Sequence, residues 1–358
     1  MSGVEALVLR DGGAVSVETL RADAPGPGEV AVRMAGSGIC GSDLHVFHGK
    51  SDAAVPPMVL GHEGAGVVEE VGPGVFHLAV GDHVVIASTE PCYRCETCLR
   101  GSFYFCPNST PHLVHLHDDD GPIPSYAGVG SLATGAVIAA GRAVKVPDDV
   151  DLGLAATVGC GVLTGLGAVL NTAAPAPGES VLVVGCGGVG LNVVQGCRLV
   201  GAKTIIAVDP SGDRLSLADT FGATHCIDVS SDEMEAAVRA IAPAGVDVSY
   251  EVVGNADLLV RTLELTRLGG TCVSIGAADV STEIRLPARY LMYTEKRLTG
   301  SLMGHSLPQR DIPKIIELYR SGHILLDELV GERVPFSEWR QAVAHTEAGK
   351  VARCVVTF

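Results

Sequence analysis

The fold is decided by one stretch of the chain, Val181-Leu182-Val183-Val184-Gly185-Cys186-Gly187-Gly188-Val189-Gly190. Its four apolar residues predict a buried strand, and its glycines follow the pattern G-x-G-x-x-G into a helix expected over Val189–Val200. Glycines permit a tight turn and the close approach of a pyrophosphate, which the unpaired N–H groups at a helix N-terminus favour. The motif therefore predicts a dinucleotide site formed by Gly185, Gly187, Gly188, Val189 and Gly190. The alternative is a plain glycine turn.

Strands and helices alternate around this turn. We expect strands over Ser180–Val184, Thr204–Val208, Val246–Glu251 and Thr271–Ile275, and a second helix over Asp213–Phe221. Apolar strands joined by helices indicate an α/β fold with a doubly wound parallel sheet, as in a Rossmann coenzyme domain.

The choice between NAD and NADP depends on the end of the second strand. Asp209 lies nineteen positions after Gly190. A carboxylate there accepts hydrogen bonds from the ribose hydroxyls and repels a 2′-phosphate, so NAD is favoured over NADP. Arg214, five positions further, is a second candidate for this ribose, although an arginine on a helix face is more often only solvated.

The rest of the chain has a different character. Short apolar runs such as Val30-Ala31-Val32 are separated by glycine and proline, which indicates a β-rich domain. Near the end we expect a helix over Leu307–Ser321 and a strand over Val351–Phe358. We therefore predict one domain from residues 1–161 and 303–358, interrupted by the Rossmann domain over residues 162–302.

The composition excludes several classes of partner. The 358 residues carry a formal net charge of −16, which argues against nucleic acid and anionic membranes because both require a basic surface. No apolar run has the length of a membrane span, and the N-terminus lacks the pattern of a signal peptide. We therefore expect a cytoplasmic protein. In that reducing compartment, clustered cysteines among the eleven present indicate metal binding rather than disulfides.

Four of these cysteines are closely spaced. Cys92, Cys95, Cys98 and Cys106 follow the pattern C-x₂-C-x₂-C-x₇-C. Four thiolates can surround one zinc ion tetrahedrally and leave no open position, so we predict a structural zinc in a lobe over about residues 88–110. Disulfides and an iron–sulfur cluster are the alternatives, and nothing else in the sequence suggests electron transfer.

Three scattered residues form a second candidate metal site: Cys40, His62 and Cys160. Two thiolates and an imidazole would leave a fourth position on zinc for water or an alcohol. Their spacing does not bring them together, and a lone buried cysteine or histidine more often serves packing than ligation.

The motifs around these residues resemble the zinc-containing medium-chain alcohol dehydrogenases. They are Cys40-Gly41-Ser42-Asp43-Leu44-His45, Gly61-His62-Glu63-Gly64-Ala65-Gly66, the four cysteines, and Gly159-Cys160-Gly161-Val162-Leu163-Thr164-Gly165, in the order and at the intervals of the family. The stretch Gly159–Asn171 is most similar to the branch with class III and mycothiol-dependent formaldehyde dehydrogenases. The resemblance implies a GroES-like catalytic domain beside the Rossmann domain, two zinc ions per chain, and NAD.

The resemblance also implies residue roles. Cys40, His62 and Cys160 would ligate the catalytic zinc, with Glu63 as an alternative ligand and Asp43 orienting His62 from behind. Further residues are implied to contact the cofactor: Thr164 and Val189 at the nicotinamide, Arg353 at the pyrophosphate, and Ile275. Ser42 and His45 would carry the alcohol proton away, a task that suits histidine because its ordinary pKa is about 6.5.

The expected activity is hydride transfer between a primary or secondary alcohol and NAD, with the bound zinc making the alcohol more acidic. The alternatives are a thiol-dependent formaldehyde dehydrogenase, a polyol or sugar dehydrogenase of one pathway, and a non-enzymatic redox sensor that binds NAD and zinc.

Two positions depart from the family pattern, and one segment is ambiguous. Gly41 replaces a basic residue that contacts cofactor phosphate in some members, and Ser88 stands where others carry an aromatic, which suggests a wider substrate pocket. The segment Pro111–Tyr126 contains His112, His115 and His117, and loop histidines are a commoner explanation than a third metal site. The length of this segment resembles the branch of the family that forms dimers rather than the tetrameric branch with a shorter loop, so we expect a homodimer.

Overall fold

The protein is described by a computed structural model covering residues 3–51, 54–109, 114–231, 233–349 and 351–358. The chain divides into two compact units. Unit 1 comprises Met1–Gly161, Leu307–Ser321 and Val330–Phe358, and unit 2 comprises Val162–Ser306 and Gly322–Leu329. The sequence-based assignment placed residues 303–306 and 322–329 with the first domain, whereas their contacts lie within unit 2.

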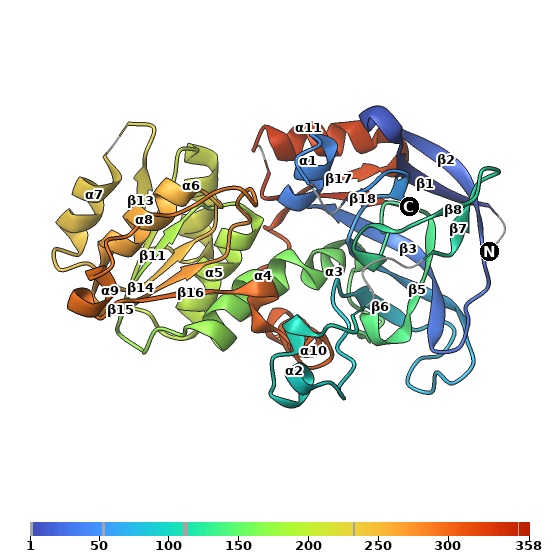
Figure 1. Cartoon of the computed structure of the whole chain (residues 1–358), viewed down its shortest axis with the longest axis horizontal. Helices are drawn as coiled ribbons and strands as arrows, with labels where there is room; N and C mark the ends of the chain where they lie inside the picture. Colours follow the sequence, from blue (N-terminus) through green and yellow to red (C-terminus); the bar gives the residue numbers. More distant parts are fainter. Residues whose placement is uncertain (1–2, 52–53, 110–113, 232, 350) are drawn as a thin grey trace. The chain divides into compact units, whose positions relative to one another are not determined.

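Unit 1 is built on two sheets (Figure 1). The smaller has the order β4-β1-β2-β7-β8, and the larger has the order β10-β6-β5-β3-β18-β17, with β9 also paired to β3. The strands are β1 Val4–Leu9, β2 Val15–Ala22, β3 Glu29–Ile39, β4 Met58–Val59, β5 Glu63–Val71, β6 His83–Ile86, β7 Leu116–His117, β8 Pro122–Ile123, β9 Gly135–Ala139, β10 Ala143–Lys145, β17 Val330–Pro335 and β18 Arg353–Thr357.

The helices of unit 1 connect and flank these strands. They are α1 Gly41–Phe47, α2 Glu96–Leu99, α3 Leu152–Ala155, α10 Pro308–Arg320 and α11 Trp339–Glu347. Helix α11 packs against α1 through stacked rings of Phe47 and Trp339, whose centroids are 5.9 Å apart. Helix α10 confirms the helix predicted over Leu307–Ser321. Strand β18 confirms the strand predicted over Val351–Phe358, and it begins two residues later than expected.

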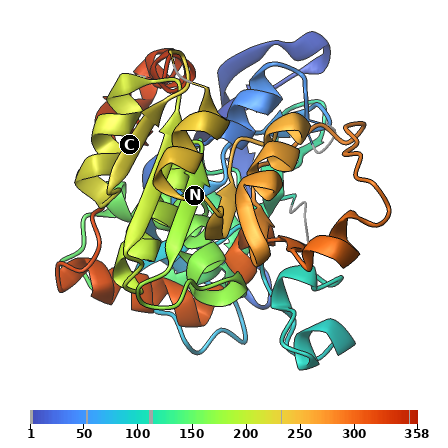
Figure 2. The same ribbon diagram turned by 90° about the vertical axis from the view of Figure 1, so that its left-hand side faces the viewer.

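Unit 2 has a six-stranded parallel sheet in the order β13-β12-β11-β14-β15-β16. Helices cover both of its faces (Figure 2). Its elements are α4 Gly161–Gly167, which begins at the boundary, then β11 Ser180–Val184, α5 Gly188–Leu199, β12 Thr204–Asp209, α6 Gly212–Phe221, β13 His225–Asp228, α7 Met234–Ile241, β14 Val246–Glu251, α8 Ala256–Leu265, β15 Thr266–Ser274, α9 Tyr290–Thr294 and β16 Arg297–Gly300. The predicted α/β class with a doubly wound sheet is confirmed.

The strand order explains the position of the glycine turn. β12 pairs on one side of β11 and β14 on the other, so the topology switches direction at the carboxyl end of β11. Ligands of open α/β sheets bind at such switch points. Leu182, Val184 and Ile206 form the buried centre of this unit. The glycine motif therefore lies at the edge of the sheet where a dinucleotide is expected.

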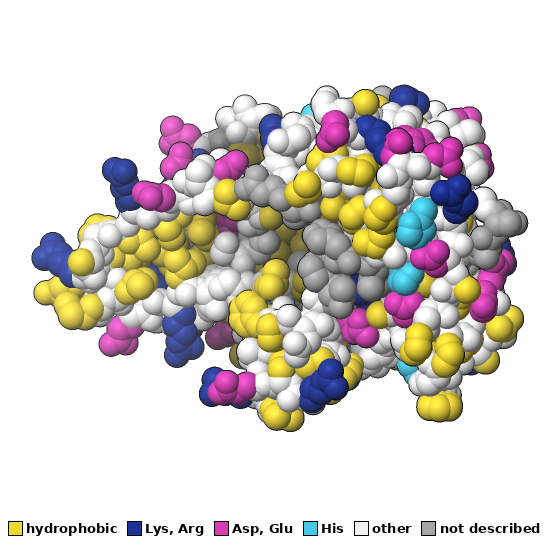
Figure 3. Space-filling view, turned by 45° about the vertical axis from the view of Figure 1, so that its right-hand side comes forward, with side chains coloured by type: hydrophobic (Ala, Val, Ile, Leu, Met, Phe, Trp, Pro, Cys, Tyr) yellow, Lys and Arg dark blue, Asp and Glu magenta, His cyan; other side chains and the backbone are white. Residues whose placement is uncertain are grey.

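Charged side chains of both signs lie at the surface (Figure 3). Acidic and basic side chains are interspersed on the face shown in Figure 3. Within the described ranges, no single helix is long and apolar enough to cross a membrane; the bent pair Leu152–Gly159 and Gly161–Thr172 meets those criteria only when its halves are taken together.

Candidate active site

Two thiols, an imidazole and a carboxylate converge in unit 1. The ligand atoms of Cys40, His62, Glu63 and Cys160 all lie within 4.8 Å of one another, and all four side chains are buried. Cys40 follows β3 and caps α1, while His62 directly precedes β5, which begins at Glu63. A Cβ at Gly159 would lie 2.1 Å from the Ile86 carbonyl oxygen, so only glycine lets the segment before Cys160 come this close. The structure thus joins residues that the sequence spacing alone did not.

Asp43 holds two of these residues at once. Its Oδ1 lies 3.0 Å from His62 Nδ1, and its Oδ2 accepts the backbone N–H of Cys40 at 2.9 Å. Because Nδ1 faces the carboxylate, Nε2 is the nitrogen left for a metal. Asp43 is itself 2 % exposed. This is the position that the sequence predicted for it behind His62.

Arg353 lies beside this cluster. Its Nε is 3.4 Å from Glu63 Oε2, and its Nη2 is 3.8 Å from Cys40 Sγ. Burial raises the pKa of Glu63 to about 7, against the opposing charge of Arg353. A hydrogen bond from the Cys160 thiol, together with the Arg353 charge, lowers the pKa of Cys40 well below its usual value although burial opposes this. The sequence did not anticipate the ion pair with Glu63, and the pyrophosphate contact of Arg353 stays a prediction.

This set of donors fits zinc. Two buried sulfurs and one imidazole nitrogen are ligands that zinc prefers, and three protein ligands leave a position open. The Glu63 carboxylate is engaged by Arg353, which suits an alternative ligand better than a permanent one.

Ser42 and His45 lie on α1, next to Cys40. Three positions separate them, so they share one side of the helix, and both are exposed. Ser42 Oγ is 4.0 Å from Cys40 Sγ. The structure therefore places Ser42, the first relay candidate, at the metal cluster. His45, the second candidate, lies about one turn further along the helix, towards solvent.

Two further residues contact His62. The ring of Tyr126 meets the imidazole edge-on, with centroids 5.6 Å apart, and Ser88 Oγ donates to the His62 carbonyl oxygen at 3.3 Å. Ser88 is half-buried, and Tyr126 is 9 % exposed. No sequence motif marks Tyr126. Its contact with His62 arises because the short turn over Tyr126–Gly128 folds back onto the cluster, which the sequence did not predict.

The four remaining clustered cysteines also converge. The sulfurs of Cys92, Cys95, Cys98 and Cys106 lie within 4.8 Å of one another around α2. Cys106 Sγ accepts the Cys92 N–H at 3.3 Å, and Asn108 donates to Cys92 Sγ at 3.2 Å. The Asn108 hydrogen bond is the main cause that lowers the pKa of Cys92 to about 5. All eleven cysteines are free thiols, which excludes the disulfide alternative. Four sulfurs with no other donor fit a closed zinc site.

In unit 2 the glycine turn is held by Asp209. The carboxylate accepts the Cys186 N–H at 2.8 Å and the Ser211 N–H at 3.0 Å, while Arg214 Nη1 lies 3.7 Å away. A Cβ at Gly190 would lie 1.8 Å from the Gly185 carbonyl oxygen, so glycine is required there. Helix α5 begins at Gly188, with Gly187 as its N-cap. The structure thus places Asp209 against the glycine turn and Arg214 beside Asp209, and the ribose contacts expected of both residues stay predictions.

The other cofactor candidates of unit 2 lie close by. A Cβ at Gly165 would meet the Val189 carbonyl oxygen at 2.4 Å, so α4, which carries Thr164, approaches α5 closely. Thr164 Oγ1 is 3.9 Å from Met303 Sδ. Ile275 follows β15 and donates its N–H to the Glu251 carbonyl oxygen at 2.8 Å. All three lie at carboxyl ends of strands or beside the glycine turn.

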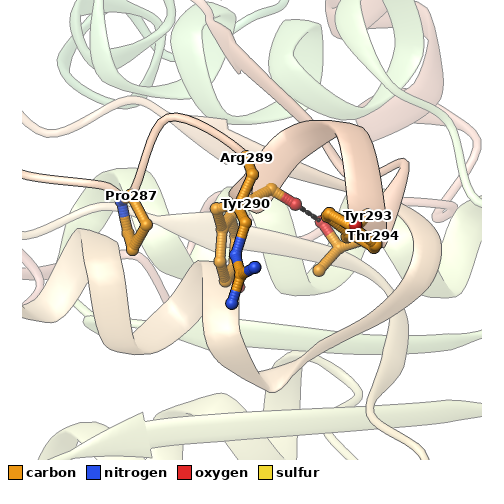
Figure 4. A pocket seen from close by; sticks show the side chains of 5 residues that line it. All are labelled: Pro287, Arg289, Tyr290, Tyr293 and Thr294. Atoms are coloured by element: carbon orange, nitrogen blue, oxygen red, sulfur yellow. Dashed lines mark hydrogen bonds between the residues drawn. The ribbon is translucent and has the colours of Figure 1, made fainter.

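A separate pocket in unit 2 does not contain any of these residues. It is lined by Pro287, Arg289, Tyr290, Tyr293 and Thr294 (Figure 4). The Arg289 guanidinium lies 5.5 Å from the Tyr293 ring centroid. With no metal ligand or glycine turn in its walls, this pocket is not the candidate active site.

The histidine-containing segment does not form a third metal site within the described residues. His115 pairs with Glu29 at 3.0 Å and His117 with Asp23 at 2.8 Å, and His112 lies outside the described residues. Asp118 also accepts the N–H groups of Asp120 and Gly121. These contacts support the loop interpretation.

Known proteins share this architecture. The family model described as "Alcohol dehydrogenase GroES-like domain" matches residues 26–148, and the family model described as "Zinc-binding dehydrogenase" matches residues 188–321. The chain is 33 % identical to S-(hydroxymethyl)glutathione dehydrogenase of Paracoccus denitrificans, over 99 % of each chain. It superposes on an alcohol dehydrogenase zinc-binding domain protein from Burkholderia ambifaria with a TM-score of 0.93, 35 % identity and 99 % of each chain covered. The benzyl alcohol dehydrogenase of Acinetobacter calcoaceticus gives a TM-score of 0.92 at 31 % identity, with both chains fully covered. The chain belongs to the zinc-dependent alcohol dehydrogenase family.

Proposed function

We propose that this protein interconverts an aromatic or other bulky primary alcohol and its aldehyde with NAD as hydride acceptor. The observation that carries the proposal is the buried convergence of Cys40, His62 and Cys160, oriented by Asp43. Zinc bound there supplies Lewis acidity toward the alcohol oxygen, and NAD supplies the hydride acceptor. A closed, purely structural metal site would not leave a position open.

The chain's own residues remove the proton. Ser42 Oγ, beside Cys40, accepts the proton of the substrate hydroxyl and passes its own toward His45, one turn further along α1. His45 is exposed, so its ring exchanges the proton with solvent. Asp43 keeps the proton of His62 on Nδ1 throughout, which leaves Nε2 as the ligand atom.

The cofactor preference rests on Asp209. Its buried carboxylate lies at the end of β12 against the glycine turn, where it opposes a 2′-phosphate. Arg214, 3.7 Å away, neutralises part of this charge. We therefore expect NAD to be used in preference to NADP.

The substrate class rests on Ser88 and Tyr126, which both contact His62. A small side chain at Ser88 leaves room beside the metal ligand, and the Tyr126 ring offers an apolar wall for a flat substrate. The similarity to benzyl alcohol dehydrogenase points in the same direction. The similarity to S-(hydroxymethyl)glutathione dehydrogenase makes a thiol–formaldehyde adduct the second candidate substrate.

The test is a substrate screen with zinc-loaded protein and NAD. We expect turnover of benzyl alcohol at a higher kcat/KM than ethanol, and two zinc ions per chain by metal analysis. Preferred oxidation of the adduct formed from formaldehyde and glutathione or mycothiol would assign the second candidate. A preferred polyol or sugar would replace the aromatic substrate class. One zinc ion with no turnover would support a redox sensor instead.

We further propose a cytoplasmic homodimer. β16 is the edge strand of its sheet, and α9 directly before it exposes Leu291, Met292 and Tyr293. An open strand edge beside apolar side chains is a surface that a second copy can cover. Eleven free thiols suit a reducing compartment. Light scattering that gives a tetramer or monomer would contradict the dimer.

A further inference from the structure

Arg142 is the largest fully buried side chain of the described residues, at 1 % exposure. It ends the short turn over Ala140–Arg142, between β9 and β10. A buried guanidinium is costly because it loses its hydration, and burial lowers the pKa of Arg142 although Glu90 opposes the shift. No role in metal or cofactor binding accounts for this charge.

Its hydrogen bonds connect two segments that are far apart in sequence. Nη1 donates to the Ser88 carbonyl oxygen at 2.8 Å and to the Ala127 carbonyl oxygen at 2.9 Å, and it also lies 3.5 Å from the Ala87 carbonyl oxygen. The Arg142 carbonyl oxygen in turn accepts the Ala87 N–H at 2.9 Å. Ala127 has a φ of 52°, an unfavourable value for a residue with a Cβ, so this turn needs support from its surroundings.

Both segments contact the same metal-ligand candidate on their other side. Ser88 Oγ donates to the His62 carbonyl oxygen, and the Tyr126 ring packs edge-on against the His62 imidazole. Arg142 therefore supports both segments that contact His62, the one at Ser88 and the turn at Tyr126–Ala127, on the side away from His62. An apolar residue of the same size would fill the volume but remove the hydrogen bonds to the Ser88 and Ala127 carbonyl oxygens.

The Nε side of the guanidinium faces Glu90. Arg142 Nε lies 4.0 Å from Glu90 Oε2, and the Glu90 N–H donates to Ser109 Oγ at 3.2 Å. Glu90 and Ser109 flank the four-cysteine lobe on either side. The same guanidinium thus lies between Glu90, next to the four-cysteine lobe, and the Ser88 carbonyl oxygen.

We propose that Arg142 is a positioning residue for substrate selection, which fixes Ser88 and the Tyr126–Ala127 turn and so sets the width of the alcohol site. This inference rests on the proposed function for its substrate readout. Displacing Ser88 or Tyr126 changes how a bulky substrate is held and alters the support of His62, while Cys40, His62 and Cys160 remain the candidate ligands. The effect therefore falls on KM for bulky alcohols more than on kcat.

The test compares Arg142→Met, which removes the guanidinium hydrogen bonds, with Arg142→Lys, which keeps a cationic donor. Val30→Ala is the matched control, because Val30 is fully buried in the same unit at the end of β3 remote from Cys40. For zinc-loaded enzyme we expect Arg142→Met to lower the ratio of kcat/KM for benzyl alcohol over ethanol by about tenfold or more, mainly through KM. Arg142→Lys should restore most of that ratio, and Val30→Ala should lower thermal stability without changing it.

A second readout does not need turnover. With cobalt(II) in place of zinc, the visible bands report the geometry around His62, and we expect them to shift in Arg142→Met but not in Val30→Ala. A ratio within twofold of the parent together with unchanged cobalt bands would overturn the proposal. If the parent protein oxidises no alcohol, the proposed function fails and the cobalt bands alone decide for or against Arg142. Arg142→Gln, shorter and uncharged, replaces the methionine variant in both measurements if that variant does not fold.

Discussion

Asp43→Asn is the substitution whose consequence follows most directly from the structure. The two oxygens of Asp43 each accept one N–H group, from His62 Nδ1 at 3.0 Å and from the Cys40 backbone at 2.9 Å. Asparagine has the same shape but only one acceptor oxygen, so its NH₂ group must face one of these two donors. Either the Cys40 N–H loses its partner, or the His62 proton moves to Nε2, where it blocks the metal.

The magnitude follows from the lost hydrogen bond. A hydrogen bond to a charged group contributes about 1.5–3 kcal/mol, and a buried donor left without a partner costs a similar amount. Since about 1.4 kcal/mol corresponds to a factor of ten, zinc affinity at the Cys40–His62–Cys160 site should fall about 10- to 100-fold, which agrees with substitutions behind metal-bound histidines elsewhere.

The assay is zinc retention against a chelator of graded concentration, followed by metal analysis. We expect Asp43→Asn to lose one zinc ion per chain at a lower chelator concentration than the parent, while the four-cysteine zinc is retained. Asp82→Asn is the control, because Asp82 also accepts a backbone N–H, from Ala79 at 2.9 Å, but takes no part in the cluster. Equal retention of both zinc ions by Asp43→Asn and the parent would refute the reasoning.

Three further predictions concern the other candidate residues. Ser42→Ala should keep both zinc ions and NAD binding but lose about 10²–10⁴-fold in kcat, as expected when a proton-transfer group is removed, and steady-state rates near normal would exclude the relay. Cys98→Ser should reduce the zinc content from two ions per chain to one, because Cys98 is buried within the four-sulfur cluster, and should expose the segment between Cys92 and Cys106 to protease. Resistance of this segment to protease after the zinc is lost would contradict the structural role. Asp209→Ala should raise KM for NAD about 10- to 100-fold and narrow the preference over NADP, since a charge-assisted contact is lost; an unchanged ratio of kcat/KM for the two cofactors would show that Asp209 does not select between them.

The unit 2 fold was accessible from sequence because its signals are local. The strand β11, the glycine turn and the start of α5 follow one another in ten residues, and each limits the next. The start of β15 was missed. The sequence predicted a strand from Thr271, but pairing with β14 begins at Thr266, through a stretch whose Gly269 and Gly270 resemble a turn. Here sheet pairing overrides the local preference.

The metal cluster was predicted only through the family resemblance, and its surroundings were not predicted in full. Cys40, His62 and Cys160 come from three elements, and no spacing rule relates them. Arg353 meets Glu63 because β18 pairs with β3, a contact between strands more than 300 positions apart. Tyr126 and Arg142 depend on short turns, where a residue's neighbours in space are unrelated to its neighbours in sequence.

The pairing of β18 with β3 also determines the order in which the centre can be assembled during synthesis. The three candidate zinc ligands are present once residue 160 has been made, but the arginine that balances Glu63 and Cys40 lies 313 positions after Cys40. Most of unit 2, residues 162–306, is also made before that arginine. A metal ion that binds before the last strand has docked therefore meets a Glu63 carboxylate with no counter-charge. The charge balance of the cluster is therefore among the last features of the fold that can form.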